Sequence, residues 1–328
     1  MNCKNQYKKN SRDPPPEKAF KPPTSPDLLH TTSSPLTQLA HAKLNLFLHV
    51  VGVDKNGLHK LESLVVFTEL HDLIAIEEAD GLALHRHGPF ARKVDAKPQE
   101  DIIIQAASSL GKLVGITPKV KISVTKNIPV SAGLGGGSSD AAATLKSLCQ
   151  YWGIKKNRAD IKKLALTLGA DVPACFHGKE AVMRGVGEII IPATLPTSRI
   201  PTVLVKPKKP LSTRSVFERF EGPFSDEQDL KLRFKSLGSL LTYLSTKTNS
   251  LTASARNLCS DIEHALCSLQ TSSGCTISRL SGSGPTCFGL FVSEKSANEA
   301  AAKIALAHPD WWVISTAILK QTSTAPNL

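Results

Sequence analysis

The sequence of 328 residues has no long hydrophobic run and no closely paired cysteines. No apolar stretch approaches the ~20 residues that a membrane-spanning helix needs, so we expect no membrane partner. The seven cysteines are odd in number and include no C-x-x-C pair. This pattern argues against a disulfide framework and against a zinc site, and it favours reduced thiols and a cytoplasmic location.

Acidic residues are too few to balance the basic ones, and the formal net charge is +12. Such an excess attracts anions, including nucleotides, phosphorylated metabolites and nucleic acid. Aromatic residues make up only 5% of the chain, and no lysine run is interleaved with them. We therefore expect small-molecule anions and no nucleic-acid partner. The length and the 41% hydrophobic content are typical of a globular protein with a sizeable core.

Residues 1–37 are rich in Pro, Lys, Ser and Thr and contain little that could form a core. The runs Pro14-Pro15-Pro16 and Pro22-Pro23 predict an extended or disordered tail. The tail has no continuous apolar segment, so we expect no secretory signal. The acids Asp13, Glu17 and Asp27 argue against an organellar transit peptide.

Residues 129–143 form a glycine cluster that leads into two serines, an aspartate and three alanines. Glycines let a backbone approach a ligand closely, and Ser138, Ser139 and Asp140 are good N-cap residues for a helix over 138–151. The free N–H groups of such a helix predict a site for a polyphosphate. No lysine follows the glycines, so this is not the common phosphate loop. Nor is it a G-x-G-x-x-G motif, because Ser138, Ser139 and Asp140 follow Gly135-Gly136-Gly137. The alternative is a flexible turn before a structural helix.

Two charged residues elsewhere are candidates for chemistry. Gly169-Ala170-Asp171-Val172-Pro173 presents an acid before a proline, which biases Val172 toward an extended backbone and makes the loop rigid. Asp171 could be a general base, although these residues alone favour a capping aspartate in a turn. Lys43 lies in an apolar strand, where it would either face solvent or pair with a buried acid.

The remaining pattern interleaves strands with helices and predicts an α+β protein. We expect strands over 42–51, 61–67, 72–77, 119–125, 200–205, 276–280, 286–292 and 311–318. We expect helices over 101–113, 138–151, 158–168, 261–269 and 297–307, and a mostly helical segment over 213–246. The small residues of 280–286 join two strands as either a plain hairpin loop or a second wall of the phosphate pocket.

The three motifs, in this order, resemble those of the GHMP small-molecule kinases over roughly residues 38–320. The resemblance implies a two-lobed α+β fold, with a ribosomal S5 domain 2-like lobe over 38–195 and a ferredoxin-like lobe over 196–328. It implies ATP and Mg²⁺ in the cleft between the lobes, and a monomer or a homodimer. The segments that carry it are 42–46, 57–61, 129–143, 168–173, 185–188 and 281–286.

Within the superfamily, the strand with Lys43 and Asn45 together with Gly-Ala-Asp-Val-Pro is similar to one branch. That branch phosphorylates the 2-hydroxyl of a methylerythritol carrying a cytidine diphosphate, in the non-mevalonate route to isoprenoids. The resemblance implies catalytic roles for Asp171 and its partner Lys43. It implies ATP binding by Pro129, Ala132, Gly133, Leu134, Gly135, Gly136, Gly137, Ser138, Ser139 and Asp140, with Mg²⁺ held through Ser138 or Ser139. It implies substrate binding by Asn45, His59, Asp171 and Phe217.

The sequence departs from this branch at three positions. Asn56 stands where the branch usually has aspartate. Leu58 stands where the branch usually has tyrosine, which removes an aromatic ring that could flank a pyrimidine. Asp101 stands where it usually has asparagine; either residue caps a helix, but an added negative charge argues against direct contact with a nucleotide. The alternatives are a GHMP kinase for homoserine, mevalonate or a sugar, a nucleotide-binding regulator without catalysis, and an RNA-binding protein.

Overall fold

The computed structural model describes residues 35–320 except 95–96, 198 and 228–229. The predicted tail therefore lies almost entirely outside the described residues, and the first strand begins at Leu36, within its last two positions. The predicted boundary between the lobes at residues 195 and 196 stays a prediction. None of the described helices is both long and apolar enough to cross a membrane.

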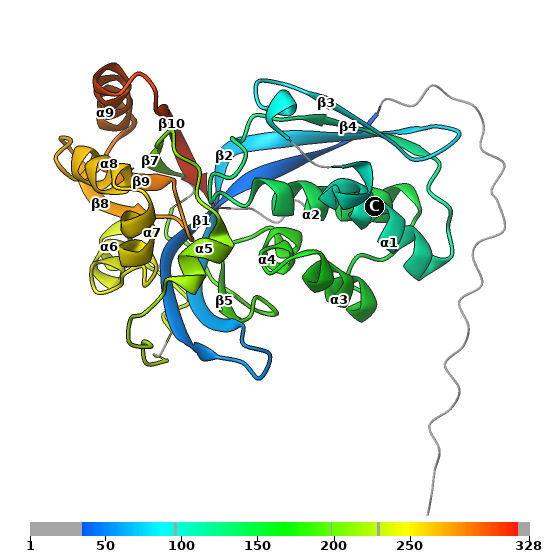
Figure 1. Cartoon of the computed structure of the whole chain (residues 1–328), viewed down its shortest axis with the longest axis horizontal. Coiled ribbons are helices and arrows are strands. Elements are labelled where there is room, and N and C mark those ends of the chain that lie inside the picture. Colours follow the sequence, from blue (N-terminus) through cyan, green and yellow to red (C-terminus); the bar gives the residue numbers. More distant parts are fainter. Residues whose placement is uncertain (1–34, 95–96, 198, 228–229, 321–328) are drawn as a thin grey trace, which may run out of the picture. The chain divides into compact units, whose positions relative to one another are not determined.

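The described strands form one mixed sheet in the order β3-β4-β2-β10-β7-β9-β8, while β1 and β5 also pair with β2, and β6 pairs with β5 (Figure 1). The strand bounds are β1 (Leu36–Val53), β2 (His59–Glu78), β3 (Ala83–His87), β4 (Val120–Thr125), β5 (Ala181–Gly185), β6 (Ile189–Pro192), β7 (Arg199–Lys206), β8 (Cys275–Leu280), β9 (Cys287–Phe291) and β10 (Trp312–Leu319).

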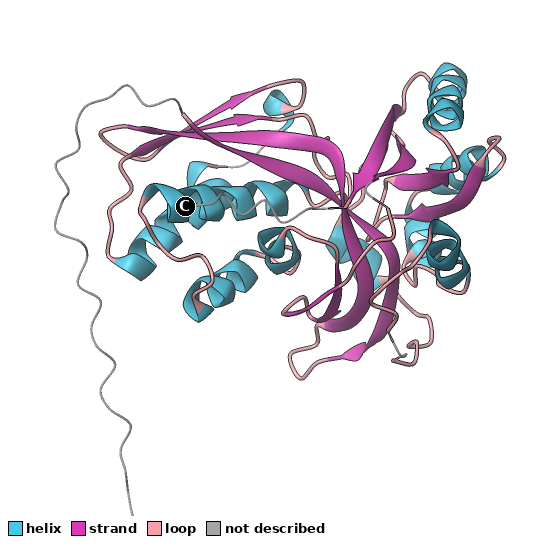
Figure 2. Ribbon diagram, turned by 180° about the vertical axis from the view of Figure 1, so that it is seen from behind, coloured by secondary structure: helices cyan, strands magenta, loops and turns pink. Residues whose placement is uncertain are grey.

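The helices gather in two groups separated by strands (Figure 2). The helix bounds are α1 (Ile102–Val114), α2 (Gly136–Tyr151), α3 (Ala159–Leu168), α4 (Val172–His177), α5 (Thr213–Glu218), α6 (Leu237–Ser245), α7 (Thr252–Leu258), α8 (Asp261–Gln270) and α9 (Glu294–Ala307). One core cluster packs α1–α4 against β2 and β4, and another packs α7–α9 against β7–β9. A third cluster joins β1, β2, β7, β9 and α6. The predicted α+β class is confirmed.

The long strand β1 is irregular at the positions that carry its polar side chains. Its antiparallel register with β2 shifts between His41 and Lys43 and again between Asn45 and Phe47. Such bulges bend a strand and redirect the side chains beside them. Between the two shifts the register is continuous from Lys43 to Asn45, so these side chains, two positions apart, lie on one face of the strand and reach one cavity.

Most predicted elements are present, but several expectations were wrong. Residues 59–78 form the single strand β2 rather than two short ones, because the segment contains no glycine or proline that would interrupt its pairing with β1. The segment 213–246 is helical only in α5 and α6; its described residues between them, which include Gly222 and Pro223, form no helix. The sequence reading missed β3, β5, β6, α4 and α7.

Two expectations about local backbone were also wrong. Helix α2 begins at Gly136 behind Gly135, whose left-handed φ of 63° makes it the N-cap residue, so Ser138 and Ser139 lie inside the first turn. Val172 is not extended but opens α4, because a proline is tolerated in the first turn of a helix, where its missing N–H costs nothing.

Candidate active site

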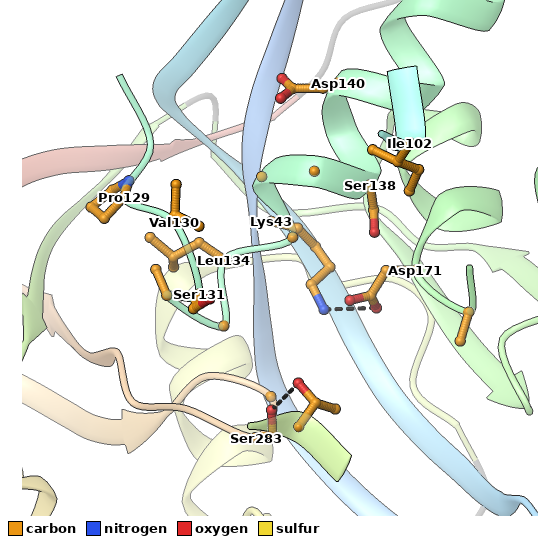
Figure 3. Close-up of a pocket in the computed structure, with 18 of the residues that line it drawn as sticks. Lys43, Ile102, Pro129, Val130, Ser131, Leu134, Ser138, Asp140, Asp171 and Ser283 are labelled. Atoms are coloured by element: carbon orange, nitrogen blue, oxygen red, sulfur yellow. Dashed lines mark hydrogen bonds and ion pairs between the residues drawn. The ribbon is translucent and has the colours of Figure 1, made fainter. Parts of the chain in front are cut away.

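A cavity of about 420 Å³ opens where the glycine loop meets β1 and the start of α4 (Figure 3). Its lining includes Lys43 and Asn45 from β1, Asp171 from the start of α4, and Ser283 from the loop between β8 and β9. The loop 129–138 supplies one wall. Residues far apart in the sequence thus meet around one space.

The centre of the cavity is an ion pair between Lys43 and Asp171. The Lys43 Nζ donates to Asp171 Oδ1 at 2.8 Å and to Asn45 Oδ1 at 2.8 Å. The Lys43 side chain is only 4% exposed, whereas that of Asp171 is 33% exposed. Lys43 is therefore the buried partner of an acid rather than a solvent-facing lysine, and the acid remains open to a ligand.

Asn45 is itself held in place from behind. Its Nδ2 donates to Ser63 Oγ at 2.7 Å, and this hydroxyl donates to the carbonyl of Phe47 at 2.6 Å. Asn45, Ser63 and Phe47 are all buried. Because every member of this chain has a partner, the Asn45 carbonyl oxygen is fixed toward Lys43.

The glycine loop packs directly on Lys43. The Lys43 N–H donates to the carbonyl of Leu134 at 2.8 Å. A Cβ on Gly135 would lie 3.2 Å from the Cβ of Lys43. Glycine at this position therefore serves two needs, a left-handed backbone and a close approach to the catalytic candidate.

The same loop is fastened to the segment 281–286. The Thr286 N–H donates to the carbonyl of Ala132 at 3.2 Å, and Ser281 Oγ donates to that of Gly133 at 3.2 Å. A Cβ on Gly133 would lie 2.9 Å from the carbonyl carbon of Gly284. The segment 281–286 is therefore a second wall of the cavity rather than a plain hairpin loop.

The first turn of α2 faces the cavity, and residues 136–138 line it. No side chain of the described residues caps this helix at Gly135. The unpaired N–H groups and the positive end of the helix dipole are the features that hold anions. Ser138 points from this turn toward Lys43 and Asp171 (Figure 3).

The two residues after Ser138 are engaged elsewhere. Ser139 Oγ donates to the carbonyl of His41 at 2.7 Å, and Ser139 does not line the cavity.

Asp140 lines the cavity, but its Oδ2 accepts from Lys126 Nζ at 2.6 Å, and Lys126 also pairs with the buried Asp72. Burial raises the pKa of Asp140 to about 7, opposed by the neighbouring Lys126. Burial would lower the pKa of Lys126, but Asp140 and Asp72 outweigh it and raise that pKa.

A further ion pair lines the cavity near the start of α1. Asp101 caps this helix by accepting from the N–H of Ile103 at 2.9 Å, as the sequence predicted. Its other oxygen pairs with Arg86 of β3. The negative charge that argued against a nearby nucleotide is thus neutralised. The sequence reading missed both Arg86 and Lys126, since nothing in their local pattern distinguishes them from surface basic residues.

An aromatic group lies at the α5 side of the cavity. Phe217 lines the cavity, and its ring centroid lies 5.2 Å from that of His59. The His59 ring also meets Phe220 edge-on at 5.8 Å. Leu58 is 55% exposed. His59 does not itself line the cavity but supports the ring that does.

Comparisons with known proteins identify relatives over most of the chain. The family model of the GHMP kinases N terminal domain matches residues 101–179, and that of the GHMP kinases C terminal domain matches residues 228–310. The chain is 41% identical over 281 residues to the 4-diphosphocytidyl-2-C-methyl-D-erythritol kinase of Paramagnetospirillum magneticum, covering 85% of this chain and 97% of that one. It is 39% identical over 289 residues to the same kinase of Rhodospirillum rubrum, covering 88% and 94%.

Solved structures show the same fold. A crystal structure of 4-(cytidine 5'-diphospho)-2C-methyl-D-erythritol kinase aligns with a TM-score of 0.69 and 30% identity over 87% of this chain and all of that one. A homoserine kinase from Cytophaga hutchinsonii aligns with a TM-score of 0.62 at 15% identity, covering 89% and 97%, which supports the fold alone. By the extent of these matches, the chain belongs to the GHMP kinases and, among them, to the family of 4-diphosphocytidyl-2-C-methyl-D-erythritol kinases.

Proposed function

We propose that this chain transfers the γ-phosphoryl group of ATP to the 2-hydroxyl of 4-diphosphocytidyl-2-C-methyl-D-erythritol, a step of the non-mevalonate route to isopentenyl diphosphate. The observation that carries the proposal is the Lys43–Asp171 pair, with 2.8 Å between Nζ and Oδ1, beside the uncapped start of α2. The names and coverage of the relatives support the choice of substrate.

In this reaction the substrate hydroxyl oxygen forms a bond to the γ-phosphorus, and the bond to the bridging oxygen of ADP breaks. Asp171 accepts the hydroxyl proton, and Lys43 orients that carboxylate through its hydrogen bond. The N–H groups of the glycine loop and of the first turn of α2 hold the phosphates. Most of the rate enhancement of phosphoryl transfer comes from such positioning and charge neutralisation.

Mg²⁺ is part of the proposal, and the cavity residues fit it as an ion shared with the phosphates. In the described part of the chain, no group of three or more His, Cys, Asp or Glu side chains could hold a metal. Mg²⁺ often takes only one or two protein oxygens and completes its shell with phosphates and water. Ser138 is the better protein ligand, since the Ser139 hydroxyl donates a hydrogen bond to the carbonyl of His41. When bound, the ion neutralises phosphate charge.

The proposed binding of the substrate's cytosine depends on the aromatic side chains at the α5 side of the cavity. Phe217 offers a ring at the cavity wall, and His59 supports it. With Leu58 in place of a second ring, the cytosine stacks on Phe217. The proposal also includes a cytoplasmic location and no nucleic-acid partner, as the cysteine and charge patterns predict.

A substrate panel tests the proposal. The purified chain is given MgATP with the cytidine diphosphate substrate, with homoserine, with mevalonate or with galactose, and ADP release is measured. We expect the cytidine diphosphate substrate to be strongly preferred. Preference for another acceptor would reassign the specificity, and the absence of ADP with all of them would favour a non-catalytic regulator.

A further inference from the structure

The turn between β5 and β6 is a motif that the proposed chemistry leaves without a role. It reads Gly185-Val186-Gly187-Glu188 and is closed by a hydrogen bond of 3.3 Å from the Gly187 N–H to the carbonyl of Arg184. The Glu188 carboxylate accepts from the Val186 N–H at 2.6 Å. Gly187 is buried and has a φ of 110°, a conformation that other residues rarely adopt.

This turn presses on the residue that precedes the catalytic candidate. A Cβ on Gly187 would lie 2.9 Å from the carbonyl carbon of Ala170, 3.1 Å from its Cα, and closer still to its carbonyl oxygen. Real Cβ atoms essentially never come within 3.0 Å of such neighbours. Ala170 also lines the cavity, next to Asp171.

The backbone of Asp171 is otherwise determined by the two helices that meet there. Gly169 ends α3, and the Val172 N–H donates to its carbonyl at 3.0 Å. Asp171 begins α4, and its own carbonyl accepts from the Cys175 N–H at 3.1 Å. The peptide group between Ala170 and Asp171 takes part in neither of these bonds. The turn at Gly187 packs against it.

We infer that Gly187 is a positioning residue, which sets the place of the Asp171 carboxylate through the backbone of Ala170. The inference rests on the proposed role of Asp171. An alanine at position 187 must push the Ala170 carbonyl away by about 1 Å, and a displacement of that size at a reacting group costs ~10²-fold in rate. Nucleotide binding depends on the glycine loop and should be unaffected.

The variant Gly187→Ala tests this inference against a matched control. Gly153→Ala introduces a similar backbone strain at a φ of 65°, with no described atom within 4 Å of the new Cβ. This control carries the cost of a left-handed alanine without pressing on Ala170. Gly185 in the same turn is no control, because a Cβ there would displace the Glu188 carboxylate that accepts from the Val186 N–H.

For each variant we would measure kcat, KM for ATP, the affinity for a non-hydrolysable ATP analogue, and the melting temperature. We expect Gly187→Ala to lose ~10²-fold in kcat while its nucleotide affinity stays within about twofold of wild type. We expect both variants to melt earlier, and the Gly153→Ala control to keep kcat within about threefold. A purely structural role would lower the melting temperature of Gly187→Ala without this split between kcat and affinity.

Equal kcat values for Gly187→Ala and Gly153→Ala would overturn the inference. If Gly187→Ala does not fold, Glu188→Ala decides, because it removes the acceptor of the Val186 N–H and loosens the turn. Its kcat should fall by about tenfold at unchanged nucleotide affinity, and an unchanged kcat would again refute the inference. Wild-type turnover in the same assay distinguishes failure of the proposed function from failure of the inference about Gly187. An inactive wild type counts against the proposed function, whereas with an active wild type the variants test Gly187 alone.

Discussion

Replacing Asp171 by asparagine removes the proposed base with almost no change in shape. The amide keeps an oxygen that can accept from Lys43 Nζ, which now lies 2.8 Å from Asp171 Oδ1. It cannot take up the hydroxyl proton. Since general bases contribute ~10²–10⁴ in rate, we expect kcat to fall by at least ~10², or about 2.7 kcal/mol in the barrier. The affinity for ATP should change little, because the proposed phosphate-binding groups belong to the glycine loop and α2.

The loss of turnover should exceed anything that instability could cause. Asp171→Asn leaves Lys43, whose side chain is 4% exposed, without its counter-charge, although Asn45 still accepts from it at 2.8 Å. Because Asp171 is a third exposed, water screens part of the pair, and we expect a loss of about 1–3 kcal/mol. Most domains have ~5–15 kcal/mol of stability, so the variant remains folded.

The assay follows ADP release at saturating ATP, with a parallel titration of a non-hydrolysable ATP analogue and a thermal melt. A double-mutant cycle with Lys43→Met adds a second criterion. If Lys43 acts through Asp171, the double variant should be about as slow as the worse single variant, not slower by the product of the two. Turnover above about half of wild type in Asp171→Asn would refute the proposed base.

Three further predictions follow from the surroundings of the cavity. Arg86→Met should raise KM for ATP by about tenfold, because it leaves the Asp101 carboxylate unneutralised at the cavity wall, and adding Asp101→Asn should restore most of the loss. Ser138→Ala should weaken MgATP binding, whereas Ser139→Ala should cost about 1 kcal/mol in urea unfolding at normal KM, since only Ser138 lines the cavity. Burial lowers the pKa of His49 to about 4, so stability should be constant above the unfolded value of about 6.5 and fall by up to ~1.4 kcal/mol per pH unit between 6.5 and 4. Urea melts of wild type and His49→Gln across this range check the last prediction, which fails if both slopes are the same.

The sequence alone was sufficient for most of the elements and for the main site candidates. Alternating and helical apolar patterns predicted β4, α1, α3, α8 and the β8–β9 hairpin close to their bounds, because the apolar pattern that marks one face for burial lies within each element. The glycine run, Asp171 and Lys43 were recognisable as candidates because each short motif carries its own chemistry. What the residues alone left open was whether Asp171 caps a turn and whether Lys43 faces solvent.

Only the tertiary structure decided between those alternatives. Lys43 and Asp171 are 128 positions apart, and their contact depends on the packing of β1 beside the connection between α3 and α4. The same holds for Ser139. The sequence does not distinguish it from Ser138, but Ser139 lies one residue further around the helix, and its hydroxyl donates to the carbonyl of His41. A pattern in the chain reports which face of an element is buried, but the partner that a polar side chain meets there depends on elements brought together from elsewhere.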